Sequence, residues 1–415
     1  MGSICLYFQV HQPFRLRQDY NFFQIGHNHF YEDEETNRTI MEKIAHKCYL
    51  PTNKILLELI KKYGKQFKVS FSISGLVLEQ FEKYAPKVLE SFQTLSQTGN
   101  IEFLCETYHH SLAFQYSRKE FKYQVLLHKK KIEELFCQSP QIFRNTELIY
   151  NNELAREAEK MGFKGILAEG ADRVLGWQSP NFIFKPKSTK TIKLLLKNYR
   201  LSDDIAFRFS DKGWKDYPLT TEKYCCWLQN AINKGDNINL FMDYETFGEH
   251  QWKDTGIFEF LWHLPERIIE STDIKFMTPS EVIDAYKPIS SLDVPYFISW
   301  ADTERDLSAW AGNDMQNSSI KFLYSLEKLV HKVNNENLTN IWRHLQSSDH
   351  FYYMSTKHSN DGAVHDYFNP YNSSYDAFVV YNNVLTDLKM TLKESLNQVH
   401  ADPYKDLQNF RENTL

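Results

Sequence analysis

The sequence lacks a long apolar stretch. None of its 415 residues fall in a run of the roughly 18 uncharged apolar residues that a bilayer-spanning helix requires, so we expect no membrane association. The first residues carry neither a basic segment nor a small-residue cleavage site, and we therefore expect no secretory signal peptide. An excess of positive charge is also missing. The formal net charge is −5, whereas a general nucleic-acid-binding domain is strongly basic, so we expect no nucleic-acid partner.

Cysteine is scarce and irregularly placed. The chain has six cysteines, and none stand in a Cys-x-x-Cys pair. This usage favours reduced, mostly buried thiols, as in a cytoplasmic protein, over a disulfide framework. We predict no cofactor and no metal-ligand residues in the site, and whether a structural metal such as Ca²⁺ binds is left open.

Aromatic residues are abundant. Phe, Tyr and Trp make up 15% of the chain, and 42% of the residues are hydrophobic. That much apolar material excludes disorder as the main state. The aromatic surplus suits a large core, and it also suits a site that stacks rings against a ligand.

Strand and helix patterns alternate over the first 280 residues. Gly64 ends one helical segment, and Thr278 begins another with a capping box. Such alternation predicts parallel βαβ units. Seven strands in about 280 residues fit a closed barrel better than a two-layer fold, with an open doubly wound sheet as the alternative. The predicted strands are 4–10, 69–74, 101–106, 142–147, 165–168, 238–243 and 274–277.

The pattern changes after about residue 286. Strand signals disappear, and helical spacing occupies 318–333, 338–346 and 375–397. We predict a barrel domain over residues 1–285 and a C-terminal α-helical region over 286–415. The segment between residues 168 and 222 is interpreted as a less regular insert.

Polar residues gather where the predicted strands end. Catalytic residues of parallel α/β barrels lie at the carboxyl ends of the strands. Two acids surrounded by imidazoles and aromatics suggest glycoside hydrolysis or metal-assisted hydrolysis. Taken singly, Glu147 could be a salt-bridging residue and Asp243 a helix cap, but their shared position at the strand ends favours a site. The candidates are His11, Glu106, His109, His110, Arg144, Glu147, Asp243, Glu245 and His250.

Five ordered segments carry a resemblance to a known family. FQVHQP (8–13), GNIE (99–102), FRNTEL (143–148) and FMDYETFGEH (241–250) resemble the first four signature regions of glycoside hydrolase family 57, and residues 304–316 resemble the fifth. The resemblance is strongest to the α-amylase-like branch. It implies an incomplete TIM-like (β/α)7 barrel, a C-terminal helical region that contributes to the active-site cleft, α-glucan substrates, and retention of anomeric configuration.

The resemblance also implies residue roles. Glu147 matches the family nucleophile, and Asp243 matches the general acid/base. Many members have His where Gln9 stands here; an amide can still bind a sugar hydroxyl, so we expect altered affinity and retained chemistry. Arg144 is a candidate for keeping Glu147 ionised, with a structural role equally open. Glu147, Glu245 and Glu249 are candidates for raising the pKa of Asp243, and Glu245 is also a candidate substrate contact.

The remaining candidates would contact the substrate. His11 is expected to bind sugar hydroxyls in the subsite next to the cut, and Glu106, His109, His110 and His250 are candidates for similar contacts. The resemblance brings Trp300 and Trp310 to the barrel mouth, where indoles could stack on glucose. Without it, both would be interpreted as core residues. The polar run 202–204 fits either a substrate loop or a plain turn.

We therefore predict a retaining hydrolase of α-1,4-glucans. A 4-α-glucanotransferase or branching enzyme with the same residues is the main alternative. A non-catalytic glucan-binding protein and a metal-dependent carbohydrate deacetylase are remote ones. Spacing does not show the acceptor subsites that separate hydrolysis from transfer, and the oligomeric state is left open.

Overall fold

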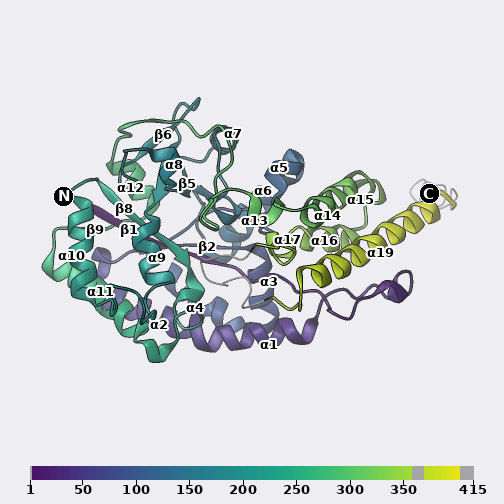
Figure 1. Cartoon of the computed structure of the whole chain (residues 1–415), viewed down its shortest axis with the longest axis horizontal. Coiled ribbons are helices and arrows are strands. Elements are labelled where there is room, and N and C mark those ends of the chain that lie inside the picture. Colours follow the sequence, from purple (N-terminus) through teal and green to yellow (C-terminus); the bar gives the residue numbers. More distant parts are fainter. Residues whose placement is uncertain (1, 358–368, 402–415) are drawn as a thin grey trace, which may run out of the picture. The chain divides into compact units, whose positions relative to one another are not determined.

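The computed structural model describes residues 2–357 and 369–401 (Figure 1). Contacts group these residues into two compact units. The first comprises residues 2–12 and 35–309, and the second comprises 13–34, 310–357 and 369–401. The grouping divides the chain later than residue 285 and assigns an early segment to the helical unit. The predicted domain boundary stays a prediction.

A ring of parallel strands forms the first unit. Strand β1 (Ser3–Val10) is buried along its whole length and lies between β8 and β2, both parallel to it. The ring closes where Cys105 bridges Phe143 between β3 and β4. Within the described residues, seven parallel strands complete it, which agrees with the predicted (β/α)7 barrel. They are β1, β2 (Val69–Ile73), β3 (Ile101–Phe103), β4 (Ile142–Arg144), β5 (Gly165–Glu169), β7 (Lys193–Lys197) and β8 (Asn237–Asp243).

One member of the ring differs from the prediction. Strand β7 lies inside the segment interpreted as an irregular insert, and it joins β5 to β8. The predicted strand 274–277 is reduced to β9 (Lys275–Phe276), which pairs only with the start of β1 in the described sheet. The sequence KLLLK of β7 lacks polar–apolar alternation because both of its faces are buried. Two short strands, β6 (Phe184–Pro186) and β10 (Ser290–Leu292), pair beside β7.

Helices connect the barrel strands, and their caps follow local sequence rules. Thr278 and Glu281 form the predicted capping box at the start of α12. The cap of α7 is Asn151, whose side chain accepts a hydrogen bond from the Leu154 backbone N–H. The helices up to residue 309 are α1 (Glu34–Ile44), a π-helical turn (Ala45–Tyr49), α2 (Leu50–Tyr63), α3 (Gly75–Tyr84), α4 (Pro86–Ser96), α5 (Ala113–Tyr116), α6 (Arg118–Phe136), α7 (Asn152–Lys160), α8 (Asp172–Leu175), α9 (Tyr199–Ala206), α10 (Thr221–Ile232), α11 (Ile257–Ser271), α12 (Pro279–Ala285) and the start of α13 (Ser308–Ala311). Short 3₁₀ turns occupy Gly64–Gln66, Thr146–Leu148, Tyr244–Thr246 and Lys253–Thr255.

The barrel interior is layered. Tyr7, Leu167, Leu195 and Phe241 belong to one buried cluster that several strands of the ring share. Because side chains alternate along a strand, the residues two positions further on face the same interior. They are Gln9, Glu169, Lys197 and Asp243. The carboxyl ends of the strands therefore place a polar layer directly on an apolar one.

The second unit is helical. The predicted helix 318–333 is two helices, α14 (Asp314–Ser325) and α15 (Glu327–Val333), which meet at Leu326. Helices α16 (Glu336–His344) and α17 (Ser348–Tyr352) follow, and α19 (Ser374–Ala401) is the longest in the described residues (Figure 1). The segment 13–34 carries one 3₁₀ turn, Phe22–Gln24.

A buried carboxylate on α19 holds the segment 13–34. Asp387 is fully buried and accepts hydrogen bonds from the Gly26 backbone N–H (2.6 Å), His29 Nδ1 (2.7 Å) and the Tyr31 hydroxyl (2.5 Å). Three donors from one short loop converge on one acceptor, so the loop and the helix form a single packed element.

Two further expectations concern the chain as a whole. In the part of the chain that the structure describes, no helix is both long and apolar enough to cross a membrane. All six cysteines are free thiols. Four of these six described residues are buried, whereas Cys137 and Cys226 are exposed.

Asp387→Ala should destabilise the helical unit by about 2–3 kcal/mol, because it leaves buried donors without an acceptor. Thermal and urea unfolding followed by circular dichroism would measure the loss. Glu394→Ala, at an exposed position of the same helix, is the control and should change stability little. Equal stability of the two variants would contradict the role of Asp387.

Candidate active site

Glu147 lies in a strained turn at the end of β4. The strand stops at Arg144, and Glu147 falls in the 3₁₀ turn Thr146–Leu148 with φ 58° and ψ 25°. This left-handed conformation costs a non-glycine residue roughly 1–2 kcal/mol. Such conformations concentrate at functional sites, where the surrounding structure imposes them.

Donors from two other elements hold the Glu147 carboxylate. Trp300 Nε1 donates to Oε2 at 2.8 Å, and the Trp300 backbone N–H donates to the Glu147 carbonyl at 3.2 Å. His110 Nε2 lies 3.3 Å from Oε1. The carboxylate is almost completely buried, so these contacts fix its orientation and compensate its lost hydration.

His110 bridges two carboxylates. Its Nδ1 lies 2.9 Å from Glu106 Oε2, while its Nε2 faces Glu147. Burial lowers the pKa of His110, but the hydrogen bonds and negative charges of Glu106 and Glu147 outweigh burial and raise it to about 9. At neutral pH the ring is therefore an imidazolium that donates from both nitrogens. His11 stacks on it, with ring centroids 3.8 Å apart, and places its own Nδ1 2.6 Å from Ser74 Oγ.

Glu106 is itself held in place by several hydrogen bonds. It accepts hydrogen bonds from Gln9 Nε2 (3.0 Å), Ser72 Oγ (2.5 Å) and His110. Burial alone would raise the pKa of Glu106, but the hydrogen bond from His110 and the charges of His110 and Arg144 lower it well below its ordinary value. Gln9 also accepts from the Tyr7 hydroxyl at 2.9 Å. The amide predicted to meet a sugar thus has partners within the protein, and its contact with substrate stays a prediction.

A second pair of acids lies at the end of β8. Asp243 is the last residue of the strand, partly exposed, and stands opposite Gln9 in the strand register. Glu245 is buried, accepts a hydrogen bond from the Tyr49 hydroxyl, and lies 3.5 Å from Gln12 Nε2. Burial and the charge of Asp243 raise the pKa of Glu245 to about 8, so Glu245 is mostly neutral at pH 7.

Arg144 contacts Glu106 and Trp300. Its NH1 lies 4.0 Å from Glu106 Oε2, and its guanidinium lies 4.8 Å from the centroid of the Trp300 ring. No described residue accepts a hydrogen bond from this fully buried group. His110 is a cation in contact with Glu147, and the role of Arg144 in keeping Glu147 ionised stays a prediction.

The other predicted site residues have different surroundings. His109 is buried against Tyr108, and the His250 backbone N–H donates to the Glu245 carbonyl. Trp310 belongs to the second unit and is fully buried, with its ring 6.4 Å from that of Tyr352, so no face of it is open to a sugar in this structure. Their substrate contacts stay predictions. Residues 202–204 are neither a loop nor a turn, because they lie within α9.

Comparison with known proteins identifies the family. The sequence profile described as Glycosyl hydrolase family 57 matches residues 5–295. The chain belongs to glycosyl hydrolase family 57. As a member of this family it is a glycoside hydrolase, and the family's (β/α)7 barrel is the ring described above.

Relatives and solved structures agree with this assignment. The chain is 44% identical over 408 residues to a Methanocaldococcus jannaschii protein named "Putative alpha-amylase", covering 95% of this chain and 86% of that one. The GH57-type branching enzyme from Pyrococcus horikoshii is 15% identical, with a TM-score of 0.64 and 86% of each chain covered. The alpha-amylase AmyC from Thermotoga maritima is also 15% identical, with a TM-score of 0.60 and coverage of 95% of this chain and 93% of that one. At this identity, the two structures show a shared fold alone.

Several residues of the candidate active site were not found from the sequence. Lys197 and Glu169 lie in the polar layer of the barrel, and Ser72 and Tyr49 bind the buried acids. Lys197 follows the apolar run 194–196 and could have been found by recognising that run as a strand. Ser72 and Tyr49 carry no comparable local signal.

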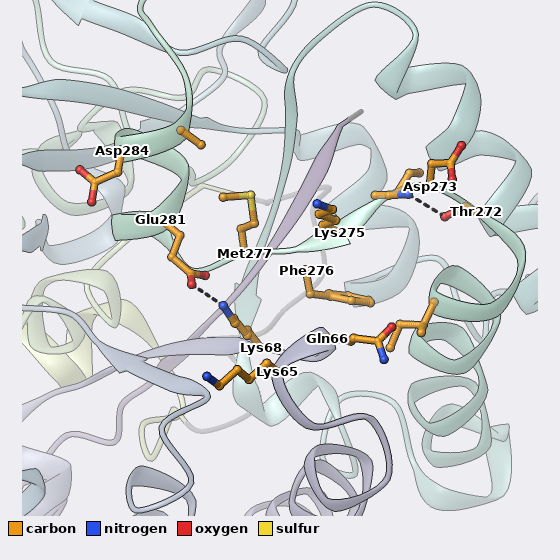
Figure 2. Close-up of a pocket in the computed structure, with 13 residues that line it drawn as sticks. Lys65, Gln66, Lys68, Thr272, Asp273, Lys275, Phe276, Met277, Glu281 and Asp284 are labelled. Atoms are coloured by element: carbon orange, nitrogen blue, oxygen red, sulfur yellow. Dashed lines mark hydrogen bonds and ion pairs between the residues drawn. The ribbon is translucent and has the colours of Figure 1, made fainter.

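A separate cavity lies at the opposite rim of the barrel. It has a volume of about 740 Å³ and is lined by residues near the starts of the strands, including Lys68, Lys275 and Phe276. Figure 2 shows Lys68 pointing toward Glu281, with which it forms an ion pair. Catalytic residues of such barrels lie at the carboxyl ends of the strands, so this cavity is distinct from the candidate active site.

Glu245→Gln should stabilise the protein increasingly between about pH 4.5 and pH 8. An unfolded glutamate ionises near 4.5, whereas folded Glu245 stays protonated to about pH 8, so the native carboxyl costs more stability as the pH rises through this window. Glutamine reproduces the protonated form and removes that cost. Melting temperatures of both proteins at pH 4, 6 and 8 would measure the difference.

The control for this experiment is Glu90→Gln, at an exposed position of α4, which should show no pH-dependent gain. A difference between Glu245→Gln and the parent protein that is the same at all three pH values would contradict the burial argument.

Proposed function

We propose that this glycoside hydrolase cleaves α-1,4-glucans with retention of anomeric configuration, with Glu147 as nucleophile and Asp243 as general acid/base. The observation that carries the proposal is the fixation of Glu147. A carboxylate in a strained turn, with donors on both oxygens, is oriented before any substrate arrives. Asp243 ends a strand of the same barrel, at the same edge.

In the first step, Glu147 attacks the anomeric carbon and Asp243 donates its proton to the leaving glycosidic oxygen. The His110 imidazolium stabilises the ionised form of Glu147 beforehand. A glycosyl–enzyme ester forms, and the shortened glucan departs with the proton.

In the second step, Asp243 acts as a base. It removes a proton from water, whose oxygen attacks the anomeric carbon and releases Glu147. Neutral Glu245 beside Asp243 adds no second negative charge at pH 7, whereas its ionisation at higher pH would disfavour the negative form of Asp243. A sugar hydroxyl in place of water would give transfer.

The substrate class is supported by the names of the relatives, which are an amylase, a branching enzyme and a second amylase. In this chain, His11 is the candidate best placed to bind a sugar hydroxyl. It is partly exposed at the end of β1 and its ring lies against His110. An α-glucan is therefore the proposed substrate and partner.

Incubation with maltoheptaose tests the reaction. The parent protein should release shorter maltooligosaccharides, and Glu147→Ala should lose roughly 10⁴-fold or more of the rate. Added azide should yield a β-glycosyl azide with Glu147→Ala and an α-glycosyl azide with Asp243→Ala, because the two variants expose opposite faces of the sugar. Chromatography and NMR of the products would distinguish them.

Each outcome has a consequence for the proposal. Products longer than maltoheptaose would assign the chain to glucan transfer. The same azide anomer from both variants would contradict the assigned roles. An absence of any turnover by the parent protein on linear and branched glucans would overturn the proposed function.

His110→Gln should move the acidic limb of the pH–rate profile upward by roughly one pH unit. The Glu147 carboxylate then loses its positively charged neighbour and needs a higher pH to ionise. His263→Gln, at an exposed position of α11, is the control. An acidic limb that does not move would show that His110 serves only in packing.

A further inference from the structure

A second group of charges lies behind Trp300, the residue that donates to Glu147. The Trp300 indole is partly buried, and two cations lie against its ring. The Arg144 guanidinium lies 4.8 Å from the ring centroid, and the Lys197 ammonium lies 5.4 Å from it. An aromatic face attracts cations at these distances, so both contacts restrict the position of the indole.

Lys197 is itself held in place. It ends β7 and is buried, with its ammonium donating to Asp203 Oδ1 at 3.0 Å and lying 3.8 Å from Glu169 Oε2. Burial lowers the pKa of Lys197, but the charges of Asp203 and Glu169 outweigh it and keep the pKa above its ordinary value. The ammonium is therefore charged throughout the neutral range.

We term Lys197, Asp203, Glu169 and Arg305 the buried ion cluster. One guanidinium nitrogen of Arg305 lies 3.9 Å from Asp203 Oδ2, and its plane lies over the ring of Tyr199 at 4.0 Å. The Ser299 backbone N–H donates to the Arg305 carbonyl at 3.0 Å. The cluster thus connects β5, β7 and α9 to the loop that carries Trp300.

Burying such a cluster of charges in the barrel interior costs free energy. Taking an ammonium out of water costs several kcal/mol, and buried ion pairs often stabilise a fold less than apolar residues of the same size. Leu195 fills the interior layer directly beneath Lys197 on the same strand. The charge at position 197 therefore calls for an explanation beyond packing, and its distinctive neighbour is the Trp300 ring.

We propose that Lys197 is a positioning residue for the nucleophile: the buried ion cluster fixes Lys197, Lys197 fixes the Trp300 indole, and the Trp300 N–H aims the Glu147 carboxylate. The inference rests on the proposed function, since it assigns a purpose to the orientation of Glu147. A cation against the indole face also draws electron density from the ring and makes its N–H a stronger donor.

Four single variants and one double variant test the proposal with two substrates. Lys197→Met removes the charge and keeps the length, Lys197→Arg restores a charge, and Trp300→Phe keeps a ring and removes the N–H. The control is Lys193→Met, on the same strand, whose ammonium donates to the backbone carbonyls of Ile283 and Tyr286. The substrates are maltoheptaose and α-maltosyl fluoride, whose fluoride leaves without help from an acid.

Lys197→Met should lower kcat by about 10- to 100-fold with KM nearly unchanged, because a misplaced nucleophile slows the chemical step. The loss should persist in first-turnover fluoride release, since that step depends on Glu147 alone. Lys197→Arg should recover most of the rate. The double variant Lys197→Met/Trp300→Phe should be no slower than Trp300→Phe, because both changes act through one contact. Lys193→Met should keep the parent kcat.

The outcomes separate this inference from the proposed function. Turnover by the parent protein, together with equal kcat values for Lys197→Met and Lys193→Met, would overturn the positioning role and leave the hydrolase. Independent, multiplying losses in the double variant would overturn the route through Trp300. An inactive parent protein on both substrates would overturn the function and the inference together.

Discussion

The imidazolium of His110, held between Glu106 and Glu147, is the interaction on which the rest of the site depends. Two buried carboxylates so close to each other would not both remain ionised without a cation between them. His110 supplies that cation, and it has a left-handed backbone, as does Glu147. The strain at these two residues is therefore offset by the ion pairs that they make with each other and with Glu106.

The barrel prepares this arrangement through the simple alternation of its strands. Apolar side chains fill one interior layer, and the positions two residues further on carry Gln9, Asp243, Glu169 and Lys197. The polar layer lies on a closely packed apolar layer, which gives it rigid support and leaves little water beneath it. Burial in this region is the main reason why the pKa values of Glu245 and Glu169 rise to about 8 and about 7.

Local sequence patterns predicted much of this structure, but not its tertiary contacts. Six of the ring strands, the capping box at Thr278 and the end of α2 at Gly64 follow from spacing that spans only a few residues. Strand β7 was missed because a strand buried on both faces lacks alternation. Motif positions singled out the acids at 147 and 243 as candidates. They did not show that His110 would bridge two carboxylates, or that Trp300 would donate to one, because those partners lie 37 and 153 residues from Glu147.

The hydrogen bonds between Asp387 and the segment 13–34 constrain the order in which the protein folds. The donors in the segment 13–34 are separated from Asp387 by 356 to 361 residues. During synthesis this segment leaves the ribosome early and must wait for α19 before its polar groups find their acceptor. The same segment exposes Phe22, Phe23 and Phe30. Contacts of such long range close slowly, so completion of the helical unit is a late event in folding, and the barrel strands have most of the translation time in which to pair first.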